Sequence, residues 1–201
     1  DCAINLTSDT AVTATFFATG IIDLNGDGRG DVFRYNPLTG AWSMDVENGI
    51  LVPWTNSTWS PAWVVKTGDF NGDGITDFFL YNVTTGQWFK AINTGLGDFT
   101  YFTSKWSPGW SVGIVDLNGD GKSDVFAYNQ TTGQWFRCTS IGSGTTGFAY
   151  AGGTWSPNWQ VHPADLNADG RTDFFLYNPA TGQWFRATND GLNGFTYVTG
   201  F

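Results

Sequence analysis

The sequence has few of the residues on which most active sites depend. Its 201 residues include one histidine, two cysteines and one methionine, and Lys and Arg together number 9 against 18 Asp and Glu. No apolar stretch approaches the roughly 18 residues that a membrane-spanning helix needs. The formal net charge of −9 argues against nucleic acid, whose phosphates require a basic surface, and against anionic membranes. We therefore expect no nucleic-acid partner and no membrane insertion.

The two cysteines, Cys2 and Cys138, can form at most one disulfide. Cys138 falls where other repeats carry Ala91 and Ala187, which favours a small buried side chain over a bridge. The distance between the two thiols cannot be derived from the sequence. A Cys2–Cys138 disulfide is therefore the less favoured of two interpretations.

Aromatic residues and glycine are abundant, and they recur in a regular order. Aromatics make up 17% of the chain and charged residues only 13%, so side-chain packing must supply most of the stability. The segment 23–36 recurs at 69–82, 116–129 and 165–178, with starts 46, 47 and 49 residues apart. Each copy continues through a Thr-Gly pair to a tryptophan, and Trp-Ser-Pro-x-Trp precedes the second, third and fourth copies. A period of this length is typical of repeat architectures.

Within a repeat, short strands alternate with turns. Residues 78–81, 87–91 and 99–103 are rich in β-forming residues and are separated by Gly-containing turns, and a further strand starts at Trp63. Helical periodicity is absent. Four strands in about 47 residues match a propeller blade.

The sequence therefore predicts an all-β, four-bladed β-propeller with four antiparallel strands in each blade, over residues 16–201. The repeats run from about 16–58, 59–105, 106–154 and 155–201, and residues 1–15 form an N-terminal tail or closing strand. The alternative architecture is part of a larger ring that a second copy or further sequence completes.

An acidic loop of the pattern Asp-x-Asn-x-Asp-Gly-x-x-Asp opens each repeat. Calcium takes six to eight oxygen ligands, and side chains at positions 1, 3 and 5 of a tight loop converge on one point. The carbonyl at position 7 and the Asp at position 9 complete the expected set. The predicted ligands are Asp23, Asn25, Asp27, Arg29 and Asp31; Asp69, Asn71, Asp73, Ile75 and Asp77; Asp116, Asn118, Asp120, Lys122 and Asp124; Asp165, Asn167, Asp169, Arg171 and Asp173.

The charge distribution supports about four Ca²⁺ sites. The loops hold 12 of the 18 acidic residues, and four calcium ions would bring the net charge from −9 to about −1. Position 12, where an EF-hand loop needs an acidic residue, falls inside strands as Arg34, Leu80, Ala127 and Leu176. The loops are therefore not EF-hands, and ordinary Asn-Gly and Asp-Gly turns are the remaining alternative.

The loop pattern resembles the FG-GAP/VCBS repeats of integrin α-subunit propellers and of secreted bacterial and fungal propellers. The resemblance covers roughly residues 16–201 and implies calcium sites on the rim of a propeller and a secreted or cell-surface location. Residues 1–15 resemble the closing strands of a divergent internalin-type repeat, which would make them the remnant of an upstream domain. They would otherwise seal the ring beside 195–199, or pair with a neighbouring molecule.

The Trp-Ser-Pro-x-Trp segments are the best candidates for a ligand site. Tryptophan rings stack on the apolar faces of sugars, and propeller lectins that resemble this chain bind glycans at blade junctions. Packing between blades is the alternative interpretation, and the first repeat, with Thr13 and Phe17 at the matching places, would lack a pocket. The candidate ligand-binding residues are Trp59, Trp63, Trp106, Trp110, Trp155 and Trp159.

Two further features carry weaker expectations. The Trp-Phe-Lys/Arg runs at Lys90, Arg137 and Arg186 could bind an anionic glycan, although a solvated cation on an outer strand is the favoured interpretation. His162 has no partner for catalysis, and the sequence contains no Ser-His-Asp set or phosphate loop. We expect no catalytic residues and no enzyme activity.

Two function classes follow from the sequence. The first is a calcium-stabilised extracellular module that binds a cell-surface or cell-wall glycan. The second is a structural or adhesive module whose partner is a protein, including further copies of this chain.

Overall fold

The computed structural model describes residues 22–142 and 147–200, which contain fifteen β-strands. In these residues there is no helix that could span a bilayer. The strands are β1 (Val32–Tyr35), β2 (Ala41–Glu47) and β3 (Leu51–Thr58); β4 (Val64–Gly68), β5 (Asp77–Tyr81), β6 (Gln87–Asn93) and β7 (Phe99–Lys105); β8 (Ser111–Val115), β9 (Asp124–Tyr128), β10 (Gln134–Ser140) and β11 (Phe148–Thr154); β12 (Gln160–Ala164), β13 (Asp173–Tyr177), β14 (Trp184–Asn189) and β15 (Phe195–Gly200).

The strands form four antiparallel sheets, each built from strands that are consecutive in the chain. The first sheet has the order β1-β2-β3, and the other three have four strands each: β4 to β7, β8 to β11 and β12 to β15. Neighbouring strands pair as hairpins, for example Phe78 opposite Ala91 and Tyr81 opposite Trp88. This confirms the prediction of an all-β fold made of repeated antiparallel sheets. Closure of the sheets into a four-bladed ring stays a prediction.

The hairpin between the second and third strand of each four-stranded sheet is set by an Asn and a Gly. The Asn82 side chain accepts hydrogen bonds from the amides of Thr84 and Thr85, and the Gly86 amide donates to the Asn82 carbonyl over 2.8 Å. Gly86 has a φ of 77°, in the left-handed region that favours glycine. The same Asn and Gly recur at the same spacing in all four repeats, because the turn needs both residues at these places.

The hydrophobic core lies between consecutive sheets rather than within one. Three clusters of buried residues join the first sheet to the second, the second to the third, and the third to the fourth. The central strands β5 and β9 are buried along their whole length, as expected for strands covered on both faces. A single sheet could not bury these residues, so each sheet depends on its neighbours.

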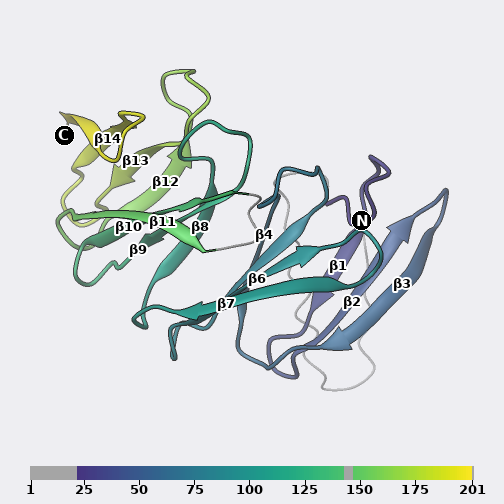
Figure 1. The fold of residues 1–201 in the computed structure, drawn as a ribbon. Helices are drawn as coiled ribbons and strands as arrows, with labels where there is room; N and C mark the ends of the chain where they lie inside the picture. Colours follow the sequence, from purple (N-terminus) through teal and green to yellow (C-terminus); the bar gives the residue numbers. More distant parts are fainter. Residues whose placement is uncertain (1–21, 143–146, 201) are drawn as a thin grey trace.

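The four sheets succeed one another across the molecule in chain order, with β1–β3 and β12–β14 at opposite sides (Figure 1). The described residues contain no core cluster that joins the fourth sheet to the first. The expected tail at 1–15, which includes Cys2 and Thr13, and also Phe17 lie outside the described residues.

Candidate functional site

The second, third and fourth acidic loops each connect the first two strands of a four-stranded sheet, the first loop leads into β1, and each loop folds around its own side chains. In the loop between β4 and β5, the two carboxylate oxygens of Asp69 accept the amides of Gly72 (2.6 Å) and Gly74 (2.9 Å). The Asn71 side chain accepts the amide of Asp73 over 3.0 Å. Equivalent bonds occur in the first and third loops. The residues at positions 1 and 3 therefore shape the loop through their own hydrogen bonds.

The Asp at position 9 has a structural role that sequence reasoning missed. Asp77 is fully buried, and its two carboxylate oxygens accept the amides of Phe70 (2.9 Å) and Asn93 (2.8 Å). It thereby ties the loop to β6. Burial raises the pKa of Asp77 to about 7 and that of Asp124 to about 6, against the opposing effect of these amide bonds. The same two bonds are made by Asp31, Asp124 and Asp173.

The loops also link neighbouring sheets. The Thr76 amide donates to the Asp23 carbonyl over 2.7 Å, and the Asp23 amide donates to the Thr76 hydroxyl over 3.0 Å. Ser123 and Asp69 repeat this reciprocal pair, and so do Thr172 and Asp116. Position 8 of one loop is therefore bonded to position 1 of the loop before it.

The donor chemistry of the loops suits a hard cation only if several kinds of oxygen contribute. Calcium prefers six to eight oxygen ligands. Among the described residues, no three His, Cys, Asp or Glu side chains are gathered in a way that would hold a metal ion. A calcium ion would therefore also need the Asn amide oxygen and backbone carbonyls, which the predicted set includes. Calcium binding stays a prediction.

The fourth loop departs from the other three. Ala168 stands where the others have Gly, and it adopts a φ of 61°. Its Asp169 carboxylate is paired with the Arg171 guanidinium at 2.6 Å. The Asp165 oxygen Oδ1 accepts three amides, those of Asn167, Ala168 and Asp169. This loop has fewer oxygen lone pairs left for a cation than the loops before it.

The Trp-Ser-Pro-x-Trp segments connect one sheet to the next by wrapping around a tyrosine. The Tyr81 hydroxyl donates to the Ser107 carbonyl (2.9 Å) and accepts the Trp110 amide (3.3 Å). The Trp106 amide donates to the Gly86 carbonyl over 2.8 Å. Tyr35 and Tyr128 make the same pair of bonds to the other two segments. Each segment is thus bonded to the sheet that precedes it.

The six tryptophans of these segments are largely packing residues. The second of each pair, Trp63, Trp110 or Trp159, is buried. The first is partly buried among aromatic rings, and the Trp106 centroid lies 5.6 Å from Phe79, 5.5 Å from Trp88 and 6.2 Å from Phe148. Trp59 and Trp155 have matching neighbours. The packing interpretation therefore accounts for most of their surface.

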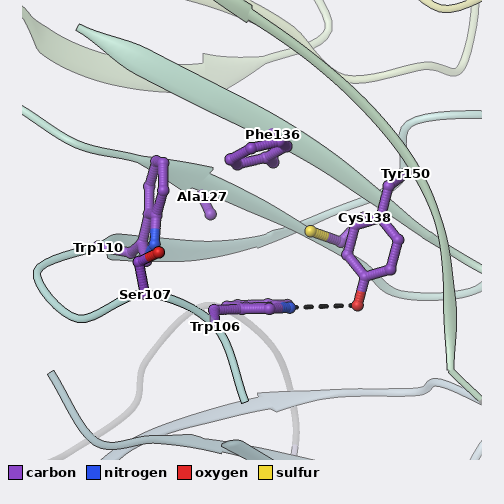
Figure 2. Close-up of a pocket in the computed structure, with 7 residues that line it drawn as sticks. All are labelled: Trp106, Ser107, Trp110, Ala127, Phe136, Cys138 and Tyr150. Atoms are coloured by element: carbon purple, nitrogen blue, oxygen red, sulfur yellow. Dashed lines mark hydrogen bonds between the residues drawn. The ribbon is translucent and has the colours of Figure 1, made fainter. Parts of the chain in front are cut away.

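The remaining exposed edges of two of these tryptophans line a pocket on the third sheet, with a volume of about 200 Å³. Figure 2 shows Trp110 and Phe136 on one side of it and Trp106 with Tyr150 on the other. The Trp106 indole N–H donates to the Tyr150 hydroxyl over 3.1 Å. Phe136 and Tyr150 are exposed, so the pocket opens to solvent. Its lining residues are Trp106, Ser107, Trp110, Ala127, Phe136, Cys138 and Tyr150.

An equivalent pocket on the fourth sheet is smaller, at about 80 Å³. It is lined by Trp155, Ser156, Trp159, Leu176, Phe185 and Tyr197. The larger Leu176 side chain occupies the place of Ala127, and Ala187 stands in the place of Cys138. The second sheet also has a leucine, Leu80, at the place of Ala127. Ala127 and Cys138 therefore distinguish the third-sheet pocket from the equivalent places on the second and fourth sheets.

Sequence reasoning missed the tyrosine that closes each pocket. Tyr101, Tyr150 and Tyr197 accept the indole N–H of Trp59, Trp106 and Trp155. They occur in a Phe-x-Tyr pattern on the last strand of each four-stranded sheet. Burial raises the pKa of the Tyr150 hydroxyl, against the effect of its bond with Trp106, so this hydroxyl keeps its proton near neutral pH.

Both interpretations of Lys90 and Arg137 were wrong, because neither side chain is solvated. Lys90 is fully buried and Arg137 is 3% exposed. The Lys90 ammonium lies 4.6 Å from the Phe148 ring centroid of the next sheet. Burial lowers the pKa of Lys90 to about 8, while Asp77 and Asp124 act in the opposite direction. These cations therefore hold sheets together and are unavailable to an anionic glycan.

Arg137 joins the third and fourth sheets by several contacts. Its guanidinium lies 5.4 Å from the Phe195 ring centroid and donates to the carbonyls of Leu117 and Gly194. Cation–π contacts and charged hydrogen bonds are strongest when they are desolvated. Arg186, at the same place on the fourth sheet, donates to the Leu166 carbonyl over 3.3 Å.

Two residues from the sequence analysis remain, and they lie in different places: His162 is apart from the third-sheet pocket, and Cys138 is at its floor. His162 is exposed on β12. Cys138 is fully buried beneath the third-sheet pocket, and burial raises the pKa of its thiol well above the ordinary value.

This architecture resembles that of a solved lectin structure, and the sequence also matches a family model. No curated protein matches the chain. A solved structure of an Agrocybe aegerita lectin, from work on its specific recognition of non-reducing terminal N-acetylglucosamine, is similar with a TM-score of 0.69 and 18% sequence identity. The match covers 89% of this chain and 50% of the lectin chain, so the present chain spans about half the length of that protein. At this identity the likeness shows the fold alone.

The acidic loops and the strands around them also match a family model. The FG-GAP-like repeat model matches residues 69–127 and 116–176. The matched segments begin at Asp69 and Asp116, the first residues of the second and third acidic loops. Because the two overlapping matches together cover residues 69–176, more than half of the 201 residues, the protein belongs to the FG-GAP-like repeat family.

Proposed function

We propose that this chain is a carbohydrate-binding module and that the third-sheet pocket holds one sugar residue. The observation that carries the proposal is a solvent-open pocket walled by four aromatic rings, with the Tyr150 hydroxyl at its edge. Aromatic faces pack against the C–H faces of sugars, and a few polar groups fix the orientation of a ligand. The similarity to a lectin supports carbohydrate as the ligand class.

The size of the pocket narrows the ligand. Pockets for drug-sized molecules measure roughly 300–1,000 Å³, and the volume here is about 200 Å³. This space suits a single terminal sugar better than an internal segment of a polysaccharide. The lectin similar to this chain recognises non-reducing terminal N-acetylglucosamine, which makes that sugar the first to test.

We further propose that calcium stabilises the acidic loops without contacting the sugar. The pocket contains none of the loop residues, whereas each loop is hydrogen-bonded to the next. A cation that binds only the folded loops would stabilise the whole series of sheets by mass action. Stabilisation by calcium and a glycan ligand would together favour a secreted or cell-surface location, and we expect no catalytic activity.

The test is a glycan-array screen of the calcium-loaded protein beside two variants. Ala127→Leu fills the pocket with the residue that the second and fourth repeats already carry, so we expect it to fold and to lose the signals. Tyr150→Phe removes only a hydroxyl and should weaken them. A blank array for the native protein would overturn the carbohydrate proposal and favour the structural or adhesive alternative, with a protein or a further copy of the chain as partner.

A further inference from the structure

A second cavity lies between the third and fourth sheets, along β8 and β12, each of which is the end strand of its sheet. Its volume is about 260 Å³, against about 200 Å³ for the third-sheet pocket, and the two cavities share no residue. We call this cavity the β8–β12 cleft. The strand residues that line it are 111–113 and 115 of β8 and 160, 161 and 163 of β12.

The cleft is hollow because β8 has a glycine where the end strands of the neighbouring sheets have long side chains. The register of the sheets places Gly113 where β4 has Lys66 and β12 has His162. A Cβ built on Gly113 would meet no atom within 4 Å. Gly113 does not have a positive φ, so its backbone does not itself require glycine. The glycine therefore leaves space that another residue could occupy.

A larger residue at the next place on the same face keeps the two sheets apart. Val115 of β8 stands where β4 has Gly68. A Cβ built on Gly68 would stand 2.5 Å from the Ser123 hydroxyl oxygen and 2.9 Å from the Ile114 side chain, so this glycine allows the third sheet to approach β4. Val115 instead lines the cleft, and β8 packs more closely on β4 than on β12.

The exposed apolar part of the lining is aliphatic rather than aromatic. Val161 is half-buried and Pro163 is exposed. Four aromatic residues also line the cleft, but each is at most 4% exposed. Sugars stack on open aromatic faces, which these buried rings do not offer. The lining therefore suits an aliphatic side chain better than a sugar ring. The four aromatic residues are Phe126, Tyr128, Trp159 and Phe174.

The polar side chains of the cleft are neutral and available for hydrogen bonding. Ser111, Gln130 and Gln160 are exposed, and their side chains are not hydrogen-bonded to any part of the chain that the structure describes. A hydroxyl or a carboxamide can both donate and accept. No charged side chain is among the residues that line the cleft. A ligand that combines amide groups with an aliphatic side chain and carries no charge, such as a peptide segment, matches this chemistry.

The edge of β8 is also less protected against strand pairing than the edges of the equivalent strands. Lysine and proline on an edge strand hinder the addition of another strand. Strand β4 has Lys66 and β12 has Pro163, whereas β8 has the sequence Ser-Val-Gly-Ile-Val and contains neither. Within the described residues, β8 pairs with β9 alone. Its second side is therefore open to an extended chain.

We propose that the β8–β12 cleft binds an extended, uncharged peptide segment that pairs with β8 and places an aliphatic side chain over Gly113. In this mode of recognition the backbone hydrogen bonds supply affinity and the cavity selects the side chain. A charged side chain would lose its hydration without gaining a partner of opposite charge. Because β8 has five residues, a pentapeptide spans the length of the strand.

The experiment titrates the calcium-loaded native chain with the pentapeptide acetyl-Thr-Val-Thr-Val-Thr-amide, followed by saturation-transfer nuclear magnetic resonance. We expect transfer to the valine methyl groups, and binding weaker by about tenfold or more when both valines are replaced with glutamate. Hydrogen exchange measured by mass spectrometry should show that the peptide slows exchange in residues 111–115. N-methylation of the valines or of the threonines tests the pairing, because amides of alternate residues face the same neighbouring strand. One of these two methylated peptides should lose binding and the other should keep it.

Two matched variants locate the site. Gly113→Lys gives β8 the residue that β4 already carries at this place, so we expect the variant to fold and to lose peptide binding. His162→Lys adds the same charge to β12 at a residue that does not line the cleft, and it should keep peptide binding. Neither variant should change the binding of N-acetylglucosamine, because the third-sheet pocket contains neither residue.

Several results would overturn the proposal. Absence of peptide binding to the native chain, or binding that survives Gly113→Lys, would show that the cleft is not a peptide site. Equal binding of the two methylated peptides would exclude pairing with β8. Slow exchange throughout residues 111–115 without peptide would mean that the protein already covers this edge, and competition by N-acetylglucosamine would identify the cleft as a sugar site.

Discussion

The glycine that follows Thr in each repeat offers a quantitative test of the junctions between sheets. Gly86 and Gly182 have the same backbone conformation but differ in how closely other atoms approach them. Gly86 and Gly182 have φ values of 77° and 75°. An added Cβ at Gly86 would stand 2.0 Å from the Trp106 carbonyl oxygen, whereas at Gly182 it would meet nothing within 4 Å. Alanine at the two positions therefore carries the same backbone strain but a different steric cost.

The expected costs follow from this geometry. A left-handed conformation costs a non-glycine residue roughly 1–2 kcal/mol, and the reduced freedom of the unfolded chain returns about 0.4–1 kcal/mol. Gly182→Ala should therefore lower the free energy of unfolding by about 1 kcal/mol. Gly86→Ala must also displace Trp106, which breaks a backbone hydrogen bond worth about 1 kcal/mol and opens a packed aromatic cluster. We expect a total of at least about 3 kcal/mol.

Urea unfolding of both variants, followed by tryptophan fluorescence and by far-ultraviolet circular dichroism, measures the difference. Agreement between the two probes is needed before a single free energy is assigned to a repeat protein of this size. Equal losses at Gly86 and Gly182 would refute the view that the Trp-Ser-Pro segment holds the sheets together through this close approach.

Three further predictions follow from the loops, the segments and the cysteine. Asp73→Asn should lower the melting temperature in calcium and leave it nearly unchanged in chelator; an equal drop in both would contradict a metal role. Ala62→Gly should stabilise the protein slightly and Gly109→Ala should destabilise it by about 1 kcal/mol in thermal unfolding, since both positions have positive φ; opposite signs would contradict this reading. Cys138 should resist iodoacetamide in the native protein, because its thiol is buried and its pKa is raised; rapid alkylation detected by peptide mass mapping would show that the pocket floor opens.

Much of the fold could be predicted from the sequence because the same pattern of residue types recurs in each repeat and therefore indicates the same local structure several times. The runs at 78–81 and 87–91 lie within β5 and β6 as expected, since apolar strands bounded by Asn and Gly turns have few alternatives. The loop side chains at positions 1 and 3 also form hydrogen bonds with amides that are close in the chain. Such features depend on short-range geometry, which a sequence pattern can specify.

The features that sequence reasoning missed depend on contacts between separate strands and loops, either within one sheet or between two sheets. Lys90 is a lone charge in the apolar run of β6 and was interpreted as a solvated cation, yet its ammonium lies against Phe148 of the next sheet. Asp77 reads as a metal ligand, yet its oxygens are bonded to amides of Phe70 and Asn93. Tyr150 contacts Trp106 from 44 residues away in the chain. None of these partners can be identified before the register of the sheets is known.

The most direct test of the account is calorimetric titration of N-acetylglucosamine into the calcium-loaded native protein and two pocket variants. We predict one equivalent of sugar per native chain, none for Ala127→Leu, and a second equivalent for Leu176→Ala, which opens the fourth-sheet pocket to the size of the third. Binding that survives Ala127→Leu unchanged would contradict the assignment of the site, and no binding in any of the three proteins would contradict N-acetylglucosamine as the ligand.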